Sequence, residues 1–156
     1  MNDSESQRKR VAAARIAVAN LSPDHRTEDL CELLTDSSFD QYQRRSAVWS
    51  LGNHPDPKAI PFLAKAIKTD ASGAVVNQSI TVLAAFKYKA AVDTLIDSFD
   101  ADFTGKNDWK RAYDPQMFRD NIAESLNHLT GQKIAANKQQ WLNWWKKHRE
   151  TSPDLK

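Results

Sequence analysis

Residues 44–70 read RRSAVWSLGNHPDPKAIPFLAKAIKTD and predict a helical hairpin. Apolar residues recur at intervals of three and four on both sides of the link NHPDP, which is the pattern of two amphipathic helices. Asp56 stands before Pro57, a capping side chain ahead of a proline at the first helical position, so we expect the second helix to begin there. So short a link holds the two helices antiparallel.

The same hairpin recurs along the chain. Leu51 and Leu83 are 32 positions apart, as are Leu63 and Leu95, and both pairs are apolar. The other pairs with this offset are Ala59 and Ala91, Ile60 and Val92, and Ile67 and Phe99. A shift of 43 aligns the first helix with a third copy, in which Leu83 matches Leu126, and an insertion of about eleven residues accounts for the longer offset. A weaker copy around Leu30 precedes them.

Helices are therefore expected throughout, with no sheet. Their predicted ranges are 4–19, 24–35, 39–52, 57–68, 72–86, 89–99, 115–130 and 137–149. The expected capping side chains are Ser4, in a capping box with Gln7, and Ser22, Asp56, Ser72, Asp114 and Asn137. Gly52 and Gly131 stand where helices would end, because a left-handed terminal residue costs least as glycine. Four hairpins that bury their apolar faces only against their neighbours form an α-solenoid.

The first and second helices of this unit resemble a HEAT repeat of the bacterial, phycobilin-lyase-like type. The resemblance rests on RRSAVWSLG at 44–52 and KAIPFLAKAIKTD at 58–70, and it covers about residues 22–149. Residues 75–100 fit less closely, because Asn77 stands where an arginine is usual and Asp93 where the proline would be. The predicted fold class is all-α, a short right-handed α-solenoid (α-α superhelix) of about four HEAT-like helical hairpins.

Three segments divide the chain. We expect residues 1–21 to form an N-terminal helix that either caps the array or is partly mobile, residues 22–149 to form the repeat domain, and residues 150–156 to be a disordered tail. The repeat domain carries an insertion loop at 100–116.

The composition argues against a disulfide-bonded or membrane-spanning protein. The chain has 156 residues, 22 Lys plus Arg and 20 Asp plus Glu, for a formal net charge of +2. That length supports one domain with a core that needs no metal or cofactor. Cys31 is the single cysteine, so no internal disulfide forms and a cytoplasmic location is expected. No stretch approaches the roughly 18 apolar residues of a membrane span.

The second helices stack into one face of the predicted solenoid. Lys65 and Lys68 point outward from one helix, with Phe62 at the margin, and the next repeat presents Asp93, Asp97 and Asp100 at matching positions. We expect Lys65 to neighbour Asp97, and Lys68 to neighbour Asp100. This surface is either a mixed-charge recognition site or a set of ion pairs between neighbouring second helices. Each exposed pair of this kind would contribute under about 1 kcal/mol to stability.

The 100–116 loop carries the densest binding composition. Trp109, Lys110, Arg111 and Tyr113 put two aromatics beside two cations, which is typical of interface hot spots. The alternative is that Trp109 and Phe103 fold back and cover the gap between repeats.

The C-terminal helix places Trp141, Trp144 and Trp145 on one stripe. We expect the stripe to pack against the preceding helix, at Phe118 and Ile122, rather than on a membrane or on nucleic-acid bases.

The sequence offers few catalytic candidates. Cys31 lies beside acidic residues that disfavour a thiolate, so we expect its thiol to face the core and not to act as a nucleophile. The four histidines lack metal-ligand spacing, and neither a phosphate loop nor a serine elbow is present. We therefore predict no enzyme, no metal and no cofactor.

The expected function is a non-enzymatic binding module, a scaffold or adaptor that binds another protein through its second-helix face and the 100–116 loop. The predicted binding residues are Phe62, Lys65, Lys68, Asp93, Asp97, Trp109, Lys110, Arg111 and Tyr113. A nucleic-acid-binding solenoid is the second candidate, supported by Lys110 and Arg111 but weakened by the near-zero net charge. A lyase ranks third, by analogy of fold alone.

Overall fold

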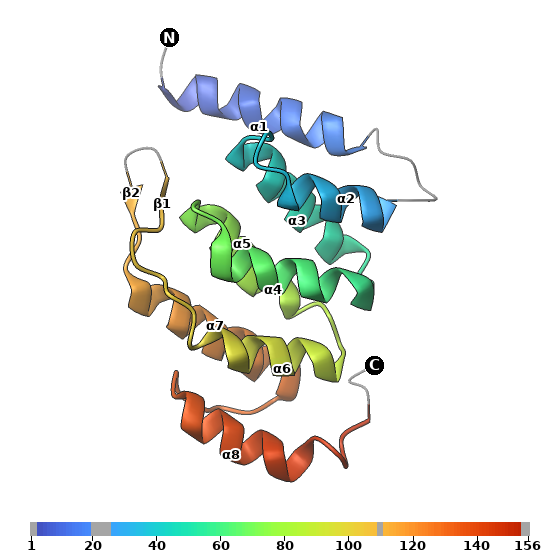
Figure 1. Ribbon diagram of the computed structural model, residues 1–156, viewed down its shortest axis with the longest axis vertical. Helices are drawn as coiled ribbons and strands as arrows, with labels where there is room; N and C mark the ends of the chain where they lie inside the picture. Colours follow the sequence, from blue (N-terminus) through green and yellow to red (C-terminus); the bar gives the residue numbers. More distant parts are fainter. Residues whose placement is uncertain (1–2, 20–25, 109–110, 154–156) are drawn as a thin grey trace.

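The computed structural model describes residues 3–19, 26–108 and 111–153. Over these residues eight α-helices stack one after another along the long axis (Figure 1). They are α1 (Asp3–Ala19), α2 (Arg26–Thr35), α3 (Gln41–Asn53), α4 (Ile60–Thr69), α5 (Gly73–Leu83), α6 (Lys89–Ser98), α7 (Pro115–Thr130) and α8 (Lys138–His148). A 3-10 turn, η2 (Pro57–Ala59), leads into α4. The all-α solenoid class is confirmed, and the helix bounds agree with the predicted ranges to within three residues.

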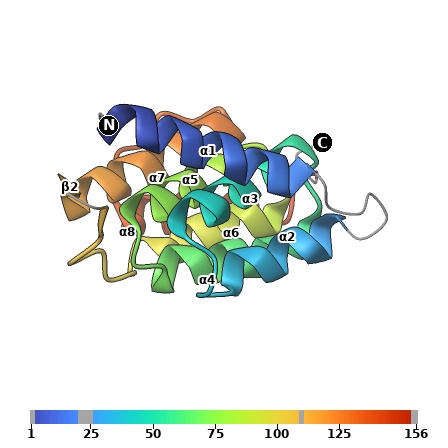
Figure 2. The same cartoon turned by 90° about the horizontal axis from the view of Figure 1, so that it is seen from above.

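The helices form two layers. One layer holds α1, α3, α5 and α7, and the other holds α2, α4, α6 and α8; we call the second of these the second-helix layer (Figure 2). Within each layer neighbouring helices are in contact, as α3 is with α5 and α4 with α6. Across the layers α2 contacts α3, α4 contacts α5 and α6 contacts α7. Each helix is thus covered on one side only, and its other side faces solvent.

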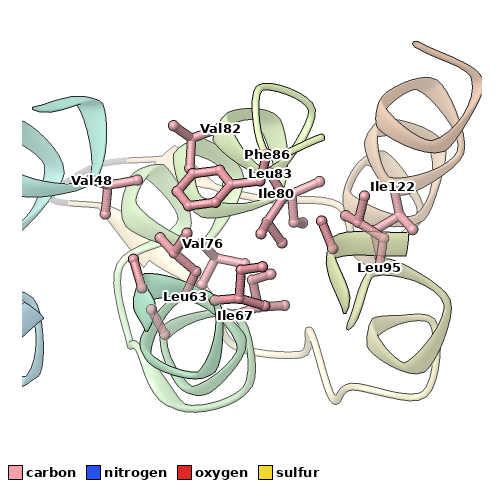
Figure 3. Packing of buried hydrophobic residues seen from close by; sticks show 14 of the residues in the cluster. Val48, Leu63, Ile67, Val76, Ile80, Val82, Leu83, Phe86, Leu95 and Ile122 are labelled. Atoms are coloured by element: carbon pink, nitrogen blue, oxygen red, sulfur yellow. The ribbon is translucent and has the colours of Figure 1, made fainter. Parts of the chain in front are cut away.

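One continuous core lies between the layers. Leu51 and its counterpart Leu83 are both buried, as are Leu63 and Leu95, so positions one repeat apart occupy equivalent environments. In Figure 3 apolar side chains from α4, α5, α6 and α7 point toward one another across the layers. The predicted internal repeat is confirmed by this shared burial.

Side-chain caps fix where the helices begin. Four of the predicted caps accept a hydrogen bond from a backbone N–H of the following turn: Asp56, Ser72, Asp114 and Asn137. Ser4 lies inside α1, which begins at Asp3, and Ser22 lies outside the described residues. Gly131 ends α7 with φ 71°, the left-handed conformation expected there. A capping box at the start of α3, formed by Asp40 and Gln43, was not part of the prediction.

The prediction that Gly52 ends a helix in a left-handed conformation is wrong. Gly52 lies inside α3, which continues to Asn53, and the positive-φ glycines of the described chain are Gly105 and Gly131. The reason for glycine at this position is the close approach of α5. A Cβ on Gly52 would lie 2.1 Å from Cγ2 of Val82, well inside van der Waals contact.

Gly52→Ala is expected to lower the free energy of unfolding by about 1–3 kcal/mol, because the added methyl overpacks the contact between α3 and α5. In an open helix the same change would instead stabilise the protein by up to about 1 kcal/mol. Urea unfolding of Gly52→Ala and of the double variant Gly52→Ala/Val82→Ala checks this. The double variant should be more stable than Gly52→Ala alone. A single variant more stable than the wild type would contradict the close approach.

The prediction of no sheet is wrong for the insertion between α6 and α7. Two short antiparallel strands, β1 (Asn107–Asp108) and β2 (Arg111–Ala112), pair Asn107 with Ala112 and Asp108 with Arg111. The hairpin lies beside the start of α5, where the N–H of Asn107 donates to the carbonyl of Ala71 at 3.3 Å (Figure 1). Strands of two residues carry too little pattern to show in the sequence.

Candidate functional site

The sign of the exposed charge alternates from one helix to the next along the second-helix layer, over α2, α4 and α6. Glu28 and Glu32 are exposed on α2, Lys65 and Lys68 are exposed on α4, and Asp97 is exposed on α6. No acidic residue occurs in α4. The two exposed lysines of α4 therefore lie between the two exposed glutamates of α2 and the one exposed aspartate of α6.

An aromatic side chain lies beside the lysines of α4. Phe62 of α4 is 40% exposed, whereas Leu63, the next residue, is fully buried in the core. At 100° per residue Phe62 falls on the same side of α4 as Lys65, one turn later. We call Phe62, Lys65 and Lys68 the α4 patch. Trp49, the other exposed large apolar side chain of the described residues, lies on α3 in the opposite layer.

Two depressions border α2. One, of about 370 Å³, is lined by Thr35 of α2 together with Lys65 and Thr69 of α4. The other, of about 420 Å³, lies where the start of α2 meets the end of α3 and is lined by Glu28, Ser50 and Lys58. Lys65 of the α4 patch therefore borders the first of these hollows, which could accept a side chain of a partner.

The expected ion pairs between α4 and α6 are absent among the described residues. No ion pair joins Lys65 to Asp97, and Asp100 is bound by Lys138 of α8 instead of Lys68. The physical reason is that α8 packs on α6 and brings its own cations to that helix. Neutralisation between rungs therefore holds between α6 and α8, while the lysines of the α4 patch pair with no described carboxylate.

Asp93, a predicted binding residue, is engaged within the chain. Its carboxylate accepts hydrogen bonds from Nε1 of Trp145 at 2.6 Å and from Nη2 of Arg149 at 2.8 Å. Burial by itself raises the pKa of the Asp93 carboxyl, but the hydrogen bonds and charge of Arg149, with the bond from Trp145, outweigh it and hold the pKa below its ordinary value. Asp93 thus fastens α8 to α6.

Two tryptophans of α8 belong to the core. Trp141 is fully buried and Trp145 is 4% exposed, whereas Trp144 is half-buried against the core. The indole N–H of Trp141 bonds to the carbonyl of Ala135, in the link before α8. The indole N–H of Trp145 bonds to Asp93 of α6, so α8 is anchored on α6.

The stem of the 100–116 loop is fixed by a buried network. Asp108 accepts hydrogen bonds from Oγ of Ser72, from the N–H of Ala74 and from the hydroxyl of Tyr113. Nζ of Lys106, a buried lysine, donates to the carbonyl of Asp70 at 2.6 Å. The carboxylate of Asp108 thereby caps the N-terminus of α5, where negative charge is favoured.

The loop residues proposed for binding fall into two groups. Tyr113 is half-buried, and its ring lies against Gly73. A Cβ added to Gly73 would lie 2.2 Å from Cδ2 of Tyr113. The ring centroids of Tyr113 and Phe118 are 5.6 Å apart. Phe103 is buried and stacks on Phe118 at 4.9 Å, so it covers the gap between repeats. Trp109 and Lys110 lie outside the described residues. Only the backbone pairing of Arg111 with Asp108 is described.

The chemistry of the described residues matches a binding surface better than a reactive centre. Cys31 is buried, and burial, with the negative charges of Glu28 and Asp56, raises the pKa of its thiol to about 11. A thiol of this kind stays protonated at neutral pH and is a poor nucleophile. The described part of the chain holds no group of three or more His, Cys, Asp and Glu side chains placed to bind a metal. None of its helices combines the length and apolar character that crossing a membrane requires.

Comparison with known proteins supports the repeat architecture. A family model described as HEAT repeats matches residues 27–106, just over half of the chain. No curated protein and no solved structure gives a significant match. HEAT repeats generally act as scaffolds for protein interaction and are typically not enzymes. The stacked hairpins, the 32-residue offset and the family match agree, and the chain belongs to the HEAT-repeat family.

Proposed function

We propose that this protein is a non-enzymatic scaffold or adaptor that binds another protein through its second-helix layer, with the α4 patch as the central contact. The observation that carries the proposal is Phe62, which is 40% exposed on α4 one turn before Lys65, and Lys65 and Lys68 pair with no described carboxylate. Aromatic residues surrounded by polar groups are typical anchors of protein interfaces.

Rigidity supports the same function. Leu63 and Ile67 of α4 are fully buried, so the backbone that carries Phe62, Lys65 and Lys68 is held by the core. A preorganised surface loses little conformational entropy when a partner binds. Lys65 and Lys68 would give the contact its charge complementarity, and Asp97 on the next helix would add a charge of opposite sign.

The loop adds a second contact in this proposal. Its stem is fixed against α5 by Asp108 and Lys106, and Trp109, Lys110 and Arg111 follow directly from that stem. We assign Tyr113 to the support of the stem, because its ring and hydroxyl are both engaged there. We place the protein in the cytoplasm, since its one cysteine is a buried thiol.

Site-specific cross-linking tests the central contact. Phe62 is replaced by the photoreactive analogue p-benzoylphenylalanine, and the exposed Glu124 of α7 in the opposite layer is replaced in the same way as a matched control. Irradiation in a native extract is expected to join a protein to position 62 and not to position 124. Equal yields of one cross-linked protein from the two positions would contradict the proposal.

The cross-linked partner then allows a measurement of affinity. Phe62→Ala is expected to raise the dissociation constant by about tenfold or more, the range of an interface hot spot, while the thermal midpoint moves little because the ring is exposed. Lys65→Ala should weaken binding less, and Glu124→Ala should leave it unchanged. A titration with single-stranded and duplex DNA at two salt concentrations serves as the check on the alternative ligand. Steeply salt-dependent binding to DNA would favour a nucleic-acid role instead.

A further inference from the structure

We propose that the segment recognised by the second-helix layer is a polyproline II stretch that crosses the helices and carries charges in the order basic, acidic, basic at every third residue. This proposal rests on the proposed function and names the chemistry of the partner.

The charge order follows from three neighbouring rungs, α2, α4 and α6, which succeed one another along the molecule (Figure 1). Their exposed charges are Glu28 and Glu32 on α2, Lys65 and Lys68 on α4, and Asp97 on α6. These residues form no ion pair with one another, whereas α6 and α8 are joined by direct pairs. A segment that crosses the rungs therefore meets negative, positive and negative charge in turn.

The spacing of the rungs selects the conformation of the segment. Helices in such layers lie about 8–10 Å apart. A polyproline II helix has three residues per turn and a rise of about 3.1 Å, so every third side chain returns to the same side after about 9 Å. In a β-strand the third residue points to the opposite side. Of these two extended forms, the polyproline II helix puts successive charges over successive rungs.

Phe62 supplies the apolar part of the recognition. It stands one turn before Lys65 on α4 and is 40% exposed. Pro-rich segments dock against exposed aromatic rings, because the pyrrolidine ring is apolar and the backbone is already ordered. Prolines between the charges of the segment would pack on the Phe62 ring while the acidic residue meets Lys65.

Two peptides of identical composition test the charge order on the intact chain. One reads Lys-Pro-Pro-Glu-Pro-Pro-Lys, and the other reads Lys-Pro-Pro-Lys-Pro-Pro-Glu. Calorimetric or anisotropy titration at low salt is expected to show about fivefold tighter binding of the first, since the second moves two charges onto rungs of like sign. Equal affinities for the two peptides, or preference for the second, would overturn the proposal.

Charge reversal on the protein provides the specific control. Lys65→Glu/Lys68→Glu changes two exposed side chains, and circular dichroism confirms that the variant is folded. This variant should lose the preference for the basic–acidic–basic peptide and bind Lys-Pro-Pro-Lys-Pro-Pro-Lys more tightly than the wild type does. Unchanged preferences would overturn the proposal. So would tighter binding of a helical peptide with its charges seven residues apart, the helical spacing that also spans about 10 Å.

The two proposals fail in different ways. If position 62 cross-links to a protein but neither charge order nor proline content affects peptide binding, the binding function stands and the nature of the segment is wrong. If position 62 cross-links to no protein, the binding function itself is wrong.

Discussion

Trp141→Ala is expected to lower the free energy of unfolding by about 3–5 kcal/mol, a large fraction of the stability of a domain this size. The indole is fully buried, packs edge-on against Trp144 with ring centroids 6.0 Å apart, and donates from Nε1 to the carbonyl of Ala135 at 3.1 Å. Alanine leaves a cavity where α8 meets the core and removes one of the two hydrogen bonds that this carbonyl accepts, the other coming from the N–H of Asn137. Urea unfolding followed by circular dichroism measures the loss, and the thermal midpoint should fall by roughly 10 °C.

Two further variants frame this result. Trp49→Ala removes the same side chain from α3, where it is 52% exposed, and should cost less than half as much. Trp141→Phe keeps an apolar ring in the cavity and should retain most of the stability, which gives a measurable variant if the alanine form does not fold. A loss below about 1 kcal/mol for Trp141→Ala would show that α8 is not part of the cooperative core.

Arg44→Met should cost about 3–5 kcal/mol, because it strands a buried carboxylate. Arg44 holds Asp70 with two bonds, from Nε to Oδ2 at 2.9 Å and from Nη2 to Oδ1 at 3.0 Å, and also donates from Nη1 to the carbonyl of Phe39 at 2.6 Å. The side chains of Arg44 and Asp70 are 16% and 7% exposed. Without the guanidinium, the described partner left to the Asp70 carboxylate is the N–H of Ser72.

The double variant Arg44→Met/Asp70→Asn separates the stranded charge from lost packing. Asparagine removes the negative charge and can still accept the hydrogen bond from Ser72. The double variant is therefore expected to be more stable than Arg44→Met, in a double-mutant cycle measured by urea unfolding. Simple addition of the two single losses would show that the pair contributes little beyond its separate contacts.

Much of the fold could be predicted because it depends on patterns that repeat along the chain. The offset that matches Leu51 with Leu83 identified equivalent core positions, and local capping chemistry identified where helices begin at Ser72 and Asp114. Residues of this kind act within one turn of their own backbone, so the sequence near them carries the whole signal.

The candidate site was predictable only in part. Helical periodicity correctly placed Lys65 and Lys68 outward on α4, and it placed Phe62 at the margin, where the side chain is 40% exposed. It also placed Asp93 outward but could not show that Trp145 and Arg149 bind it, because those residues lie 52 and 56 positions away. The pair of Arg44 and Asp70, separated by 26 positions, was missed for the same reason, although the two residues are the first and last of the predicted hairpin 44–70.

The sequence alone determined the helical repeats, the apolar seam between the layers and the side of each helix that faces solvent, because these depend on spacing along one chain. Only the tertiary structure decided which of the outward charges are already paired, why Gly52 is glycine, and how the 100–116 loop is fastened to α5. Those outcomes depend on distances between helices, which arise when the hairpins stack and which periodicity does not contain.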